Sequence, residues 1–150
     1  MQLKNSVSTV GFHLTRVTTE QFAILPESYD TDNHETNLGI GLNFGVDTSK
    51  KAVAVFFKVQ FEQKMGPFLI VEIANHFQIE DSAWTSFTSE ENKIVIPKGF
   101  ATHLLVLTIG TARGVLHSKT EKTDFNHFLL PTINASELIQ KDVELIIGNS

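Results

Sequence analysis

The sequence predicts an α+β fold in which a four-stranded antiparallel sheet precedes one long helix and a short C-terminal helix. Two observations carry this prediction. Apolar residues recur at every second position through the first half of the chain, and at three- and four-residue steps after about residue 95. The chain of 150 residues has the usual length of one domain, and no repeat or linker divides it. We therefore expect a single domain over residues 1–150.

Four extended segments are expected in the first half, at residues 7–24, 38–47, 53–61 and 68–77. The second is the most regular, because the apolar residues of one face alternate with glycine, asparagine and aspartate on the other. The apolar face consists of Leu38, Ile40, Leu42, Phe44 and Val46. Because sequential strands with short links are usually neighbours, we expect an antiparallel meander.

A long helix is expected over residues 97–120, with Pro97 at its first turn and a row of apolar residues along one side. Gly110, Ala112 and Gly114 are small, so they would let another helix or strand approach closely. An extended connector over residues 123–130 follows. Asn134 or Ser136 would then cap a short helix through residues 137–139.

Composition argues against several classes of protein. The net charge is −5 and the basic residues form no run denser than Lys50-Lys51, so nucleic acid is not an expected partner. The absence of cysteine removes disulfides and thiolate catalysis, and it agrees with a reducing cytoplasm, where we expect the protein. No apolar stretch approaches the roughly 20 residues of a membrane helix, so membrane insertion is not expected either.

Candidate reactive groups are few. The glycines of residues 39–45 lie in a predicted strand, whereas a phosphate-binding loop must open a helix. His103 and His117 share one side of the long helix but lie about 21 Å apart at 1.5 Å per residue, so they would share a metal only between subunits. The paired carboxylates fall in polar loops at residues 30–32, 80–81 and 90–91. We expect no catalysis, no metal site and no cofactor.

The aromatic residues indicate a different activity. The chain has 12 phenylalanines but one tryptophan and one tyrosine, so it carries much apolar area with few hydrogen-bonding needs. A binder of extended hydrophobic peptides needs such pockets and few directional contacts. The candidate peptide-binding residues are Phe125 and Phe128 in the connector, with Phe44 and Phe100. The alternative is that all twelve rings belong to the core.

Several motifs resemble the SecB family of export chaperones, which has the same order of elements. Residues 12–17 look like that family's opening strand, and residues 68–73 resemble its fourth strand with an internal glutamate, Glu72. Ala112-Arg113 is similar to the family's Ala-Arg helix, and residues 131–139 resemble its terminal Pro-x-Asn helix. The resemblance covers about residues 7–140.

The resemblance implies a holdase that binds unfolded preproteins or hydrophobic segments during export and forms a homotetramer, a dimer of dimers. Glu72 is the candidate residue for docking the ATPase SecA. Gln21 and Leu25 stand where the family carries acidic residues, and the acidic C-terminal tail is missing at residues 148–150, which leaves docking to SecA an open expectation. Two alternatives are a SecB-like chaperone dedicated to one partner, such as an antitoxin, and an α+β domain that binds a small ligand.

Overall fold

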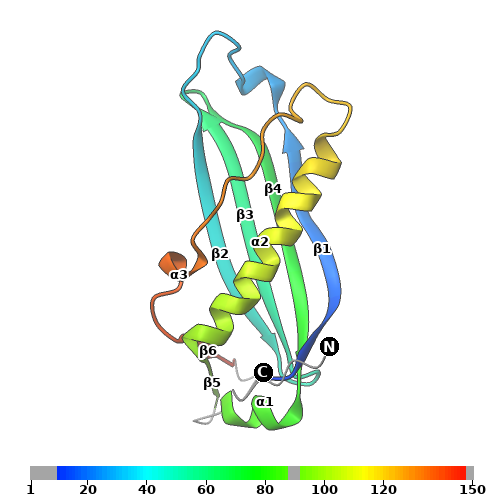
Figure 1. Cartoon of the computed structure of the whole chain (residues 1–150), viewed down its shortest axis with the longest axis vertical. Coiled ribbons are helices and arrows are strands. Elements are labelled where there is room, and N and C mark those ends of the chain that lie inside the picture. The colour runs from blue at the N-terminus through cyan, green and yellow to red at the C-terminus, as the bar shows by residue number, and fades with distance from the viewer. Residues whose placement is uncertain (1–9, 88–91, 148–150) are drawn as a thin grey trace, which may run out of the picture.

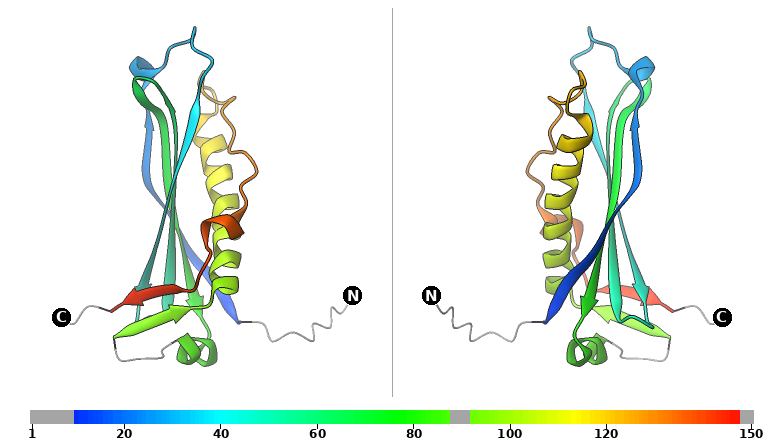
Figure 2. Two further views of the ribbon diagram at one scale, coloured as in Figure 1. Left: turned by 90° about the vertical axis from the view of Figure 1, so that its left-hand side faces the viewer. Right: turned by 90° about the vertical axis from the view of Figure 1, so that its right-hand side faces the viewer.

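The computed structural model of the chain describes residues 10–87 and 92–147, and it has the predicted α+β fold. Four antiparallel strands form one layer, and the long helix α2 (Lys98–Thr120) crosses one face of them as a second layer (Figure 1). Figure 2 shows that all the described helices lie on this side or at the ends of the strands. One face of the sheet is therefore the core face.

The strands β2 (Asn37–Asp47), β3 (Ala52–Gln63) and β4 (Gly66–Ile79) form the meander that the sequence predicts. Every second residue of β3, from Val53 to Phe61, is buried on the core face of the sheet. The residues between them, such as Phe56 and Lys58, lie on the opposite face and are half-buried. The alternation therefore assigns the two faces correctly, as expected for a strand with one face on a core.

The predicted position of the first strand is wrong. We expected a simple four-stranded meander, but β1 (Phe12–Ile24) pairs with β4, which gives the order β1-β4-β3-β2. The physical reason is that β4 is buried along nearly its whole length, so its backbone N–H and C=O groups need a strand on each edge to pair with. The connection of residues 25–36 is long enough to cross the end of the sheet. Residues 7–9 of the predicted strand lie outside the described residues.

Helix α2 begins one residue after Pro97 and buries Ala101, Leu104, Leu105, Thr108, Ile109, Ala112, Leu116 and Thr120. By length and composition, with a mean hydropathy of 1.3, it is apolar enough to cross a membrane, but these eight residues are packed inside the protein. The close packing expected at the small residues occurs at Ala112 alone. Gly110 and Gly114 are exposed, and a methyl group added to either would meet no atom within 4 Å.

The short C-terminal helix is also confirmed, as α3 (Ala135–Leu138). The Asn134 side chain accepts a hydrogen bond from the Ser136 backbone N–H (3.1 Å), so Asn134 is its cap. The sequence interpretation missed four elements, namely the short 3-10 helix η1 (Pro26–Ser28), α1 (Asp81–Phe87) and the paired strands β5 (Lys93–Ile96) and β6 (Val143–Ile146). Of the predicted polar region, residues 88–91 lie outside the described residues.

Candidate functional site

The candidates Phe125 and Phe128 lie in an aromatic cluster at one end of the sheet. Their ring centroids are 6.0 and 5.0 Å from that of Phe68, and Tyr29 and Phe61 complete the cluster. Phe125 is only 8% exposed, while Phe128 is half-buried. The sequence indicated two rings lining a groove, whereas the structure packs both against the core.

Two polar anchors hold the loops that carry this cluster. The buried amide of Gln63 accepts the Asp30 N–H (2.8 Å) and donates to the carbonyl of Asn33 (3.2 Å), which ties the β1–β2 connection, with Tyr29, to β3. The guanidinium of Arg113 donates to the carbonyls of Leu130 (3.3 Å) and Pro131 (3.0 Å), which fixes the connector along α2. Because both loops are attached to the sheet or to α2, the aromatic rings are held in place and do not form an open binding surface.

Two further candidates from the sequence, Phe100 and Glu72, lie outside this aromatic cluster. Phe100, in the first turn of α2, packs against Phe12 and Phe87, with ring centroids 5.4 and 5.6 Å away. Glu72 is half-buried on β4, where it is paired with Gln21 on one side and Lys58 on the other. The structure therefore brings Phe125 and Phe128 together but leaves Phe100 and Glu72 apart from them, and the roles of these residues in binding a peptide or docking a partner stay predictions.

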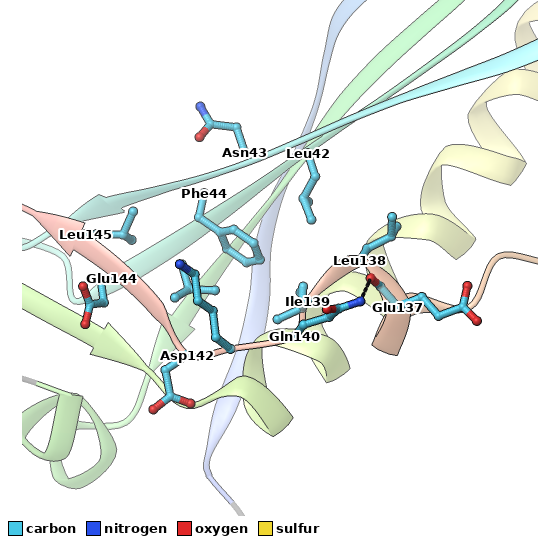
Figure 3. Close-up of a pocket in the computed structure, with 12 residues that line it drawn as sticks. Leu42, Asn43, Phe44, Glu137, Leu138, Ile139, Gln140, Asp142, Glu144 and Leu145 are labelled. Carbon is cyan, nitrogen blue, oxygen red and sulfur yellow. Dashed lines mark hydrogen bonds between the residues drawn. The ribbon is translucent and has the colours of Figure 1, made fainter.

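Phe44, the remaining candidate, lines an open groove of about 1150 Å³ between β2 and the C-terminal segment, residues 137–145. Leu42 and Phe44 point from β2 toward that segment, and Asn43 between them points away (Figure 3). The groove's apolar lining consists of Leu42, Phe44, Leu138, Ile139, Val143 and Leu145. This surface combines apolar side chains with the outer edge of a strand.

Hydrogen bonds and an ion pair fix the C-terminal wall of the groove. The Asp142 carboxylate accepts the Lys98 backbone N–H (2.9 Å) at the start of α2, which satisfies a free donor of that helix. Lys93 and Glu144 form an ion pair across β5 and β6 (3.3 Å). The wall is therefore attached both to α2 and to β5, which makes a preformed groove.

The groove offers apolar binding with little reactive chemistry. Its ionisable groups are Glu137, Lys141, Asp142 and Glu144. Residues 39–45 lie inside β2, as predicted, and so do not open a helix. His103 contacts the Phe12 ring and His117 lies 3.6 Å from Glu121. Over residues 10–87 and 92–147, no three histidine, aspartate or glutamate side chains gather as a metal site.

Sequence reasoning missed the C-terminal wall of this groove. The alternation of Val143, Glu144, Leu145 and Ile146 is a strand signal, but four residues are too few to identify a strand alone. Leu138 and Ile139 were assigned to a helix without a surface to pack on. Leu138 and Ile139 become part of a site only because the fold places residues 137–145 beside β2.

No family model and no curated protein sequence matches this chain. Among solved structures, a SecB-like chaperone of Mycobacterium tuberculosis, in complex with a ChAD peptide from an antitoxin, is similar at 12% identity and a TM-score of 0.43, over 84% of this chain and 90% of that one. A protein of unknown function from Streptococcus agalactiae matches at 14% identity and a TM-score of 0.33, over 83% and 100%. Both TM-scores are below 0.5, so neither likeness assigns a function to this chain.

Proposed function

We propose that this chain is a non-catalytic holdase that binds unfolded or hydrophobic segments of other polypeptides in the groove between β2 and residues 137–145. The observation that carries the proposal is the apolar lining of an open groove of about 1150 Å³. Each apolar client side chain removed from water contributes up to about 1.5–3 kcal/mol without requiring a particular partner atom. Several such contacts give useful affinity for many sequences. Binding of this kind needs no cofactor.

The resemblance of several motifs to the SecB family supports the same function and extends the proposal. In that extended form, the chain is a single-domain, SecB-like cytoplasmic chaperone that acts in protein export on unfolded preproteins. Docking of SecA in this form would use Glu72, with Gln21 and Leu25 in place of the family's acidic residues.

A first prediction concerns client protection. The wild-type protein is expected to suppress the aggregation of several unrelated unfolded proteins, measured by light scattering. Leu138→Ser should weaken client binding about fivefold, because the side chain is 39% exposed in the groove and its further burial is worth about 1 kcal/mol. Leu129→Ser is the matched control, since Leu129 is 61% exposed and does not line the groove.

The range of clients separates this function from its alternatives. Protection of one client only would indicate a chaperone dedicated to a single partner, such as an antitoxin. Protection of none would remove the holdase proposal and favour a domain that binds a small ligand. Equal loss of binding in both leucine variants would place the site outside the groove.

A second prediction concerns assembly as a homo-oligomer, which we expect to be a tetramer. The solvent face of α2 carries Val106 (53% exposed) and Leu107 (40% exposed), and the exposed Gly110 and Gly114 leave room for another helix beside them. An apolar, small-residue surface of this kind suits helix-on-helix contact. Light scattering should therefore give a multiple of 16.7 kDa.

Val106→Lys is expected to lower that mass toward 16.7 kDa, because it places a charge in the contact. Leu129→Lys makes the same kind of change at an exposed leucine of the connector, outside α2, and should leave the mass unaltered. A wild-type mass of 16.7 kDa at micromolar concentration would contradict the assembly proposal.

A further inference from the structure

The two edges of the sheet differ in how well they are protected. An edge strand exposes unpaired N–H and C=O groups, which bind other chains unless bulges, charges or proline prevent it. β1 has two interruptions of its register with β4, one between Leu14 and Arg16 and one between Thr19 and Gln21. It also carries His13, Arg16 and Glu20. The β1 edge is therefore irregular and charged.

β2 has almost none of these protections, since its one charged residue, Asp47, is the last of the strand. Its eleven residues pair with β3 in one unbroken register, and they include no proline, lysine or arginine. In an antiparallel pair the outward N–H and C=O groups recur at every second residue. Across residues 10–87 and 92–147, no strand pairs with this outer edge of β2. Such a long, regular edge is the surface to which a polypeptide adds as a strand.

The side chains along this edge determine what an added strand would carry. Leu42 and Phe44 point into the groove, where Leu138 and Leu145 face them (Figure 3). On the opposite face of β2, Gly41 and Gly45 leave the backbone bare. Since cross-strand neighbours share a face, alternate side chains of an added strand would enter the groove, and the others would lie beside Gly41, Asn43 and Gly45.

The charge of the groove favours basic groups in the occupant. Three acidic residues, Glu137, Asp142 and Glu144, line it with one basic residue, Lys141. Lys93 balances Glu144, and Asp142 accepts the Lys98 N–H, but Glu137 has no ion pair within the described part of the chain. A second copy of this chain, with a net charge of −5, would bring like charges together.

We infer that the groove binds its client by strand addition. The client is an extended segment that pairs with the outer edge of β2, places an apolar side chain in the groove at every second residue, and carries lysine or arginine at its ends. This inference rests on the proposed function and adds the mode of recognition to it. Backbone pairing supplies affinity for many sequences, while the period of two selects segments of β-strand character.

The test uses a synthetic peptide in which two lysines at each end flank threonine alternating with valine and phenylalanine. Two further peptides keep these side chains but carry N-methyl groups at the odd or at the even residues of the central run. Only one set of amides can face β2, so one methylated peptide should bind at least about tenfold more weakly, by fluorescence anisotropy, while the other changes little. Replacing the flanking lysines with glutamate should also weaken binding, by a factor that shrinks as salt is added.

The outcomes separate the mode of binding from the proposed function. Equal affinities for the two methylated peptides would overturn strand addition and leave the holdase proposal standing. No binding of any peptide would overturn both. Weakening by Leu138→Ser, but not by Leu129→Ser, would support this groove as the location. A fall in the mass of the protein when peptide is added would assign the edge to a second copy and overturn the inference.

Discussion

Replacing Phe125 and Phe128 with serine is expected to lower the free energy of unfolding by at least 3 kcal/mol, in the range of about 3–5 kcal/mol for truncating a buried phenylalanine. The sequence alone predicts little change in stability, because it assigns both rings to the lining of a peptide-binding groove. The structure places Phe125 within 5.3 Å of Tyr29 and 6.0 Å of Phe68, between ring centroids, and leaves it 8% exposed. The change therefore removes core contacts and leaves a cavity with a buried hydroxyl.

Urea denaturation followed by circular dichroism measures this effect. The loss in the double variant should be smaller than the sum of the two single losses, because the two rings contact each other at 6.2 Å. Leu129→Ser, in the same connector but 61% exposed, should change stability by no more than about 0.5 kcal/mol. An undiminished midpoint in the double variant, together with lost client binding, would restore the two rings to the groove that the sequence indicated.

Phe57→Ala is expected to destabilise the protein by about 3–5 kcal/mol, and Phe56→Ala by much less. These neighbours on β3 have the same side chain but opposite faces. Phe57 is 0% exposed in the core beneath α2, with Ile73 beside it on β4. Phe56 is half-buried on the other face, near the His76 ring at 6.4 Å.

The comparison of these two variants cancels the intrinsic strand preference of phenylalanine, so the difference in urea midpoint reports burial alone. It also tests the opposite face of the sheet. If Phe56→Ala destabilised the protein as much as Phe57→Ala, that face of the sheet would be covered in solution. A mass of the Phe56 variant below that of the wild type, by light scattering, would then show that a second copy covers it.

The strands β2, β3 and β4 could be predicted because each carries its own evidence. In β2, Leu42, Phe44 and Val46 alternate with small or polar residues, and a period of two is produced by any sheet that has one face on a core. The helix α3 could be predicted for the same reason, because its cap depends only on nearby residues: Asn134 accepts the N–H of Ser136, two positions later. Patterns that depend only on nearby residues can be recognised in the sequence without knowledge of the fold.

The position of β1 could not be read in this way. Its residues alternate as in any strand, and nothing within residues 12–24 states that the partner is β4 and not β2. The same limit applied to the groove. Phe44 was identified through its strand, but its neighbours Leu138 and Leu145 lie a hundred residues later, in short segments whose apolar residues make sense only beside β2.

The place of β1 has a consequence for how the chain folds. β2, β3 and β4 are joined by short turns, so we expect them to pair early. β1 pairs with a strand that is distant in the sequence, with Phe12 opposite Ile79 and Ile24 opposite Leu69. Closing so long a loop is entropically costly, and folds that depend on distant pairings form slowly. Until β1 docks, the apolar edge of β4 is unpaired. We therefore expect a newly synthesised chain to pass through a stage in which it presents the kind of exposed apolar strand that its own finished groove is proposed to hold.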